Sequence, residues 1–175
     1  MKLKFFKYDK KEIHEILTAL GVQERNTAQE KLVEISDKIF LFDSISKNDI
    51  ITMTKNVKIN KYKKNNIILK EDSRDLKIHY LINGTVTVNN NKSESSLATI
   101  KSGGMFGEMS FVSGKKRTAN IIACENCITV SFDIDINKHT KDNSYSFSKL
   151  YFNISMDLID KINTSNEKHY EYSKN

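Results

Sequence analysis

The sequence contains no proline, and only two cysteines and six glycines, among its 175 residues. Without proline, every residue of an extended segment keeps a backbone N–H that can donate to a strand ladder. No apolar run approaches the roughly 20 residues that a membrane-spanning helix needs. The amino terminus, MKLKFFKYDK, lacks the apolar stretch of a secretory signal peptide, because lysines interrupt it. We therefore expect a soluble, cytoplasmic protein.

The two cysteines, Cys124 and Cys127, stand on either side of Glu125-Asn126. A pair at this spacing could be redox-active or supply half of a zinc site. A structural zinc needs four ligands, however, and the histidines show no H-x3–5-H grouping. The flanking segments ANIIA and ITVSF are strand-like, so we expect two small residues on either side of a turn.

Charge is present but not concentrated. Charged residues make up 29% of the chain and apolar residues 38%, which is the balance of a globular protein. The net charge is +6, but the lysines are scattered, so the charge permits contact with nucleic acid without requiring it. The length suits one domain with elaborations.

Three helical patterns precede the first strand pattern. Apolar residues at helical spacing predict a helix over residues 10–20. A second helix is expected from Thr27, as its N-terminal cap, through Ile35. Ser46 can cap a third, KNDIITMTKNV, so that the helical section ends near residue 56.

From about residue 57 the apolar period changes to two. Many short strands with regular turn signals indicate a sandwich, jelly roll or barrel. His79 stands alone in one of them, and we expect it to be an exposed strand residue. The strand-like segments are VKINKY, NIIL, LKIHYLI, TVTVN, SLATI, ANIIA and ITVSF.

Helical spacing returns in residues 146–163, after the last strand. Its apolar residues share one stripe, which we expect to pack on the strands and also on a second copy of the chain. Only a short polar tail follows, too short for another folded unit. The stripe comprises Phe147, Leu150, Tyr151, Ile154, Leu158 and Ile162.

Residues 105–118 are the only break in the strand series, and they carry an isolated acid and an isolated arginine. Gly107 would let the backbone approach a ligand closely, next to the N–H groups of a helix start. Arg117 offers a planar fork that matches two phosphate oxygens, and Thr118 adds a hydroxyl. Glu108 would repel a phosphate but can accept from a neighbouring sugar hydroxyl. Together, these four residues fit a ribose phosphate.

The runs FGEMSF and RTA resemble the phosphate-binding cassette of cyclic-nucleotide-binding domains, the family of the catabolite activator protein and of kinase regulatory subunits. The resemblance extends from about Ile39 to the final helix, and HYLINGTVTV is similar to the family's strand–glycine–strand hairpin, with Gly84 at its turn. It implies a mainly β fold, an antiparallel jelly roll (double-stranded β-helix) with N-terminal helices and a C-terminal lid and dimerisation helix. We divide the chain accordingly into residues 1–38, 39–145 and 146–175.

The resemblance also implies roles for individual residues. Glu108 would accept from the ribose 2′-hydroxyl and Arg117 would bind the exocyclic phosphate oxygens, with backbone N–H groups of Gly107, Glu108 and Ser110. The alternative is a buried Glu108–Arg117 pair in a relative that has lost its ligand. The expected ligand-binding residues are Phe106, Gly107, Glu108, Met109, Ser110, Arg117, Thr118 and Ala119, with Val88 and Ala98 lining the purine pocket.

The sequence determines two features less well, namely the purine base of the ligand and the conformation of two turns. Thr118 resembles cGMP-preferring members, whereas Ser165 and Asn166 in INTSNEK resemble the segment that reaches adenine in the activator. We favour cAMP, the commoner bacterial signal, and keep cGMP open. The chain has Asn65 and Glu71 where the family usually has turn glycines, and asparagine tolerates a left-handed turn better than glutamate does.

We expect a sensor without catalysis, metal or cofactor, because no H-x-H, catalytic triad or carboxylate pair is present. Its expected partners are the cyclic nucleotide, a second copy through residues 146–163 and an effector protein that the sequence does not identify. We expect no membrane association, and no DNA binding because no helix-turn-helix follows. A ligand-free scaffold and a DNA-associated regulator without that motif remain alternatives.

Overall fold

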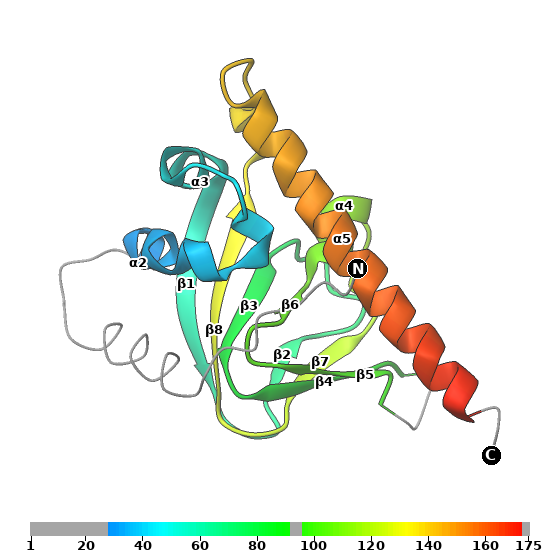
Figure 1. Cartoon of the computed structure of the whole chain (residues 1–175). Coiled ribbons are helices and arrows are strands. Elements are labelled where there is room, and N and C mark those ends of the chain that lie inside the picture. The colour runs from blue at the N-terminus through cyan, green and yellow to red at the C-terminus, as the bar shows by residue number, and fades with distance from the viewer. Residues whose placement is uncertain (1–27, 92–95, 173–175) are drawn as a thin grey trace.

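The computed structural model describes residues 28–91 and 96–172. In these ranges the strands form two four-stranded antiparallel sheets that face each other, as the predicted jelly roll requires (Figure 1). One sheet has the order β1-β8-β3-β6 and the other β2-β7-β4-β5. The strands are β1 (Thr54–Tyr62), β2 (Ile67–Leu69), β3 (Ile78–Asn83), β4 (Thr85–Asn89), β5 (Ala98–Lys101), β6 (Met105–Phe106), β7 (Asn120–Ala123) and β8 (Cys127–Ile134).

Gly84 lies where the chain passes from one sheet to the other. It separates β3 from β4, which lie in different sheets and do not pair with each other. The hairpin predicted at this glycine is therefore wrong. Its φ of +103° is left-handed, and an added Cβ would lie 2.6 Å from the Sγ atom of Cys127. Cys124 is exposed and Cys127 is buried, on either side of the predicted turn between β7 and β8. Glycine is needed at residue 84 because the backbone there passes close to Asn126 and Cys127, at the start of β8.

The helices before the strands agree with the sequence in part. The helix predicted over residues 10–20, and the cap at Thr27, lie outside the described residues. The cap at Ser46 is confirmed, since its Oγ atom accepts from the backbone N–H of Asp49 at 3.1 Å. The helices here are α2 (Ala28–Ile35), the 3-10 turns η1 (Ser36–Lys38) and η2 (Phe40–Phe42), and α3 (Lys47–Met53).

The third helix is shorter than predicted, because α3 ends at Met53 and β1 begins at Thr54. Thr54 is paired with Ile134 of β8, so strand pairing takes the last residues that the helical pattern would have included. Long-range pairing of this kind overrides a weak local preference.

One apolar core lies between the first sheet and the helices. It joins α2, η2 and α3 to β3, β8 and the helix α5 (Ser144–Tyr172), so β3 and β8 are buried on their outer face as well as their inner one. A smaller core fills the space between the sheets. Its buried members are Leu69, Leu81, Val86, Phe106, Ile121, Ala123 and Cys127.

Helix α5 crosses the roll diagonally and runs past the short helix α4 (Glu108–Ser113) (Figure 1). The predicted stripe is confirmed for Phe147, Leu150 and Ile154, which are buried, and for Leu158, which packs beside them. Tyr151 and Ile162 are 42% and 59% exposed, so the packing on the strands does not extend to them, and packing of the stripe on a second copy stays a prediction. These two residues lie at the margin of the face of α5 that packs on the roll. This face is narrower than the stripe of apolar residues expected from the sequence.

Asn153 fixes α5 to η2. Its side chain is buried, and its Nδ2 atom donates to the carbonyl oxygens of Leu41 and Asp43, both at 3.0 Å. Buried carbonyl groups need such donors. Among the described residues, no helix is both long and apolar enough to cross a membrane.

Candidate functional site

The segment over residues 105–118 is not the unbroken crossover that the sequence predicts. Its first two residues form β6, in which Met105 pairs with Tyr80 and Phe106 with His79. Phe106 is buried, and its ring stacks on the His79 ring with centroids 5.1 Å apart. The short strand anchors the segment to the first sheet before α4 begins.

Gly107 joins β6 to α4 with a left-handed φ of +94°. A Cβ atom at this position would lie 2.5 Å from the carbonyl oxygen of Lys77 and 2.9 Å from the Nη1 atom of Arg117. The backbone therefore approaches the guanidinium as closely as only glycine permits. The predicted approach of this turn to a ligand stays a prediction.

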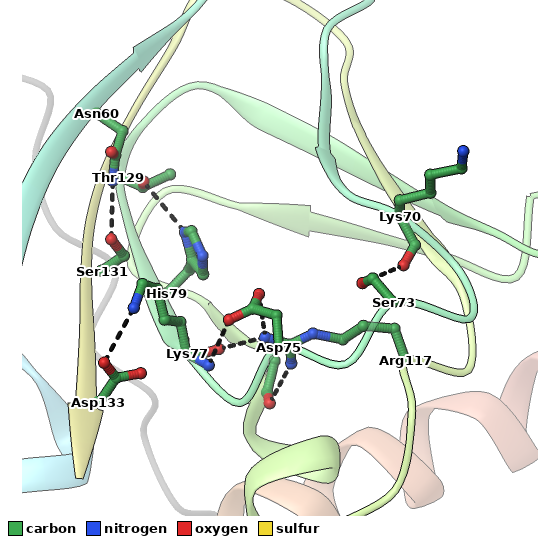
Figure 2. Close-up of polar contacts among 11 residues, drawn as sticks. Asn60, Lys70, Ser73, Asp75, Lys77, His79, Arg117, Thr129, Ser131 and Asp133 are labelled. Carbon is green, nitrogen blue, oxygen red and sulfur yellow. Dashed lines mark hydrogen bonds and ion pairs between the residues drawn. The ribbon is translucent and has the colours of Figure 1, made fainter.

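Arg117 is buried, with 4% of its surface exposed. Its Nη1 atom donates to the carbonyl oxygen of Gly107 at 2.6 Å. Its Nη2 atom donates to the carbonyl oxygen of Lys77 at 2.7 Å and to the Oδ2 atom of Asp75 at 2.8 Å (Figure 2). Burial tends to raise the pKa of Asp75, but the hydrogen bonds from Arg117 and from the backbone N–H of Lys77, together with the charge of Arg117, outweigh it and the pKa is lowered. The guanidinium is thus held in one orientation beside the start of α4.

Glu108 is buried to the same degree, but its partner comes from α5. The Nζ atom of Lys161 donates to the Oε1 atom of Glu108 and to the carbonyl oxygen of Met105, both at 2.8 Å. The same ammonium lies 2.7 Å from the Oδ2 atom of Asp157, one helical turn earlier. Burial tends to lower the pKa of Lys161, but the charges of Glu108 and Asp157 outweigh it and the pKa is raised.

The acid and the arginine therefore bond to different residues in the described part of the chain. Arg117 makes its ion pair with Asp75, and Glu108 makes its own with Lys161. The direct Glu108–Arg117 pair considered as an alternative is wrong. Each group is also left with a buried polar atom that has no hydrogen-bond partner among the described residues, Oε2 of Glu108 and Nε of Arg117. A buried unpaired atom of this kind is costly, and it marks a place where a ligand can bind.

The remaining cassette residues differ in exposure. Ser110 is buried, Ala119 is half-buried, and Thr118 is exposed. Met109 is 54% exposed on the outer side of α4.

The two expected purine-pocket residues lie together. Val88 on β4 and Ala98 on β5 are directly opposite each other in the ladder. Val88 also packs against the core between the sheets, beside Val86. Residues paired in this way share a face, so both side chains point to the interior of the roll.

His79 is 4% exposed, so the prediction that it lies at the surface is wrong. Its Nδ1 atom is 3.4 Å from the hydroxyl of Thr129, and the Nδ2 atom of Asn60 donates to the hydroxyl of Ser131 at 2.9 Å in the same row of inward-facing side chains (Figure 2). Burial lowers the pKa of His79 to about 4, and the charge of Arg117 acts in the same direction. A neutral imidazole thus lies inside the roll.

The two turns that lack the family's usual glycines differ in which residue adopts the left-handed conformation. Asn65 adopts a left-handed φ of 69°, as expected of asparagine. At the second turn the left-handed residue is Asp72, with φ of 64°, and not Glu71. The shift of one residue avoids strain at the glutamate.

Sequence reasoning did not identify Asp75, Asp157 or Lys161 as parts of the site. The i, i+4 spacing of Asp157 and Lys161 could have indicated their pairing on one helix face. Nothing local indicates that Lys161 reaches Glu108, which lies 53 residues earlier in the chain. Among the described residues, no group of three or more histidine, cysteine, aspartate or glutamate side chains could hold a metal ion.

Residues 59–136 match the family model described as the cyclic nucleotide-binding domain. This part of the chain, which contains most of the strands, is therefore similar to a cyclic nucleotide-binding domain. The matched range of this domain contains Asp75, Glu108 and Arg117, whereas α5 with Asp157 and Lys161 follows it. The comparison with curated proteins gave no significant match.

Several solved structures share the fold of this chain. A crystal structure from Geobacter metallireducens GS-15, named for cyclic nucleotide binding, has a TM-score of 0.59 and 17% identity over 78% of this chain and 99% of that one. The regulatory subunit of a cAMP-independent protein kinase A from Trypanosoma brucei has a TM-score of 0.60 and 13% identity over 85% of this chain and 50% of that one. The regulatory domain of Toxoplasma gondii PKA, crystallised with cAMP, has a TM-score of 0.56 and 13% identity over 78% and 50%.

These identities show a shared fold. The cyclic nucleotide-binding domain and its flanking helices span half the length of the two kinase regulatory chains. One of those relatives is cAMP-independent and the other was crystallised with cAMP, so the ligand must be argued from the side chains of the site.

Proposed function

We propose that the chain is a non-catalytic sensor of a cyclic nucleotide, which binds between Glu108 and Arg117. The observation that carries the proposal is the pair of buried, unpartnered atoms, Oε2 of Glu108 and Nε of Arg117. One is an acceptor and the other a donor. A ribose with a cyclised phosphate brings the complementary hydroxyl and anionic oxygen within one small molecule.

The phosphate would bind at the free edge of Arg117. The carbonyl oxygens of Gly107 and Lys77 hold the two Nη atoms, so the guanidinium does not need to be ordered on binding. Preorganised donors of this kind bind an anion without an entropic cost for fixing the side chain. Asp75 competes for the same charge, but its side chain is 37% exposed and water screens it, whereas Arg117 is 3% exposed.

The ribose would bind at Glu108. Lys161 occupies Oε1 and leaves Oε2 as an acceptor for the 2′-hydroxyl. A carboxylate oxygen is a stronger acceptor of a hydroxyl hydrogen bond than an uncharged oxygen is. We further propose that Gly107 and Ser110 supply backbone N–H groups to the phosphate, with the hydroxyl of Thr118.

The purine would lie over Val88 and Ala98, whose side chains face the interior of the roll. We favour cAMP over cGMP on the sequence of the terminal helix, where Ser165 and Asn166 are exposed and available to a base. Thr118 is the residue that favours cGMP, and the comparison of both nucleotides decides between them.

We also propose that α5 transmits binding to a second copy or to an effector protein. The buried face of α5 packs on its own roll, so a partner must contact the opposite face. That face carries Tyr145, Phe152 and Ile159 at intervals of seven residues, and they are 68%, 56% and 49% exposed. A repeat of seven residues forms a continuous seam along a helix, which a second copy of the same helix can match. The division into residues 1–38, 39–145 and 146–175 remains part of this proposal.

Thermal unfolding in the presence of nucleotide tests the proposed function. cAMP or cGMP at 100 times its dissociation constant should stabilise the fold by about 2.7 kcal/mol. 5′-AMP is the control, because its phosphate is dianionic and is not closed into a ring with the ribose, and it should stabilise the fold less. If neither cyclic nucleotide raises the unfolding temperature, the scaffold alternative replaces this proposal. A shift with duplex DNA that disappears at high salt would favour the DNA-associated alternative.

A further inference from the structure

Two carboxylates share one ammonium group at the junction of α4 and α5. The Nζ atom of Lys161 is 2.8 Å from Oε1 of Glu108 and 2.7 Å from Oδ2 of Asp157. It donates hydrogen bonds to Glu108 and to the carbonyl oxygen of Met105, and it forms an ion pair with Asp157. The two acids therefore compete for one ammonium group.

The cluster carries one uncompensated negative charge, because Glu108 and Asp157 contribute two and Lys161 neutralises one. The side chains are mostly out of water, at 3% exposure for Glu108, 22% for Asp157 and 33% for Lys161. The charged groups that act on Asp157 are Lys161 and Asp160 on its own helix and Glu108 on α4. Arg117 makes its ion pair with Asp75 and not with a member of this cluster.

We propose that Asp157 sets how tightly the site binds an anionic ligand, because its charge opposes the phosphate that Arg117 would hold. This rests on the proposed function and concerns the same site. A cyclic nucleotide carries one negative charge and meets this opposition, whereas an uncharged nucleoside does not. Asp157 thus discriminates between ligands by charge, although it lies outside the segment that matches the family.

Protonation would remove the opposing charge. Burial raises the pKa of Asp157, and the neighbouring carboxylates add to this while Lys161 partly reverses it. An anion bound nearby would raise that pKa further, so binding is accompanied by proton uptake and the affinity rises as the pH falls toward the pKa. Nucleotide binding is then coupled to proton uptake at α5.

Isothermal titration of the full chain with cAMP between pH 7.5 and 5.5 tests this role. Asp157→Asn keeps the shape of the side chain and removes its charge. We expect it to bind cAMP about tenfold more tightly than the wild type at pH 7.5, as for one like charge removed in a partly buried site. Its affinity should also depend less on pH than that of the wild type, which should rise as the pH falls. Repeating the titration in buffers of different ionisation enthalpy should show proton uptake by the wild type alone.

Two controls isolate the effect. Asp160→Asn makes the same charge change on the same helix without removing a contact of Lys161, and should change the affinity much less. Adenosine is the uncharged probe, and its affinity should be the same for the wild type and Asp157→Asn. Unfolding curves of each variant establish that the fold is intact.

The outcomes separate this inference from the proposed function. Equal affinities and equal pH profiles for the wild type and Asp157→Asn would overturn the role of Asp157 and leave the sensor standing. Absence of binding by all three proteins at every pH would overturn the sensor, and the role of Asp157 with it. Binding by Asp157→Asn alone would support both.

Discussion

Arg117 and Asp75 form an ion pair of 2.8 Å that ties the end of the cassette to the turn before β3. The pair leaves the Nε edge of the guanidinium without a partner, so one arginine serves both the fold and the proposed phosphate site. Arg117→Lys keeps the positive charge but loses the planar fork. We expect it to weaken cyclic-nucleotide binding at least tenfold, measured by calorimetry.

Asp75→Asn is the matched control for this prediction. It removes the ion pair and the competing charge but keeps an acceptor for Arg117, so nucleotide binding should be retained. If both variants lowered the unfolding temperature and neither changed the affinity, Arg117 would be a structural residue only.

Gly107 should not tolerate a side chain. In Gly107→Ala the new methyl group would meet the carbonyl oxygen of Lys77 at 2.5 Å and the guanidinium of Arg117 at 2.9 Å, at a φ of +94°. We expect a loss of about 1–3 kcal/mol of unfolding free energy in urea, together with loss of nucleotide binding as Arg117 is displaced. Gly114→Ala is the control, since its φ is +65° and nothing lies within 4 Å. It should cost about 1 kcal/mol and leave binding unchanged, and similar binding by the two variants would count against the close approach at Gly107.

His79 should make the fold less stable in mild acid. Burial lowers its pKa to about 4, whereas the unfolded chain takes up a proton near pH 6.5. The neutral form is therefore the stable one in the fold, and stability is complete above pH 6.5 and falls as the pH drops toward 4. The loss should reach about 3 kcal/mol. Urea unfolding of the wild type and of His79→Gln over this range measures it, and an equal slope in both proteins would exclude His79 as the cause.

The exposed face of α5 should determine the oligomeric state. We expect light scattering to show a dimer for the wild type and a monomer for Phe152→Glu, because a carboxylate in the seam cannot be buried without a partner. Phe40→Glu is the control, since Phe40 is 46% exposed but lies on η2. A monomeric wild type, with and without cyclic nucleotide, would contradict this part of the proposal.

Local sequence patterns predicted most of the fold. The period of two identified seven of the strands in the described residues, and the side chain of Ser46 identified the start of α3. The two-residue strand β6 was missed because it is defined by its pairing with His79 and Tyr80, which no local pattern records. His79 was placed at the surface because alternation in KIHYL implies one solvent-facing side, but helices cover the outer face of β3 and both of its sides are buried.

The site was predictable where its chemistry lies within one segment. Glu108 and Arg117 are nine positions apart, and their residue types and the glycine beside them indicated a phosphate and a sugar hydroxyl. Asp75 and Lys161 were not predictable, since each reaches its partner only after the strands have paired and α5 has packed. Their charges decide how Arg117 and Glu108 are neutralised, and this requires the three-dimensional structure.

The crystal structure of the full chain grown with saturating cAMP, or with cGMP if it binds more tightly, is the most direct measurement. We predict the ribose 2′-hydroxyl on Oε2 of Glu108 and a phosphate oxygen on Nε of Arg117, with the purine over Val88 and Ala98. A nucleotide bound elsewhere, with these two atoms still unpaired and the ion pairs to Lys161 and Asp75 unchanged, would contradict the account.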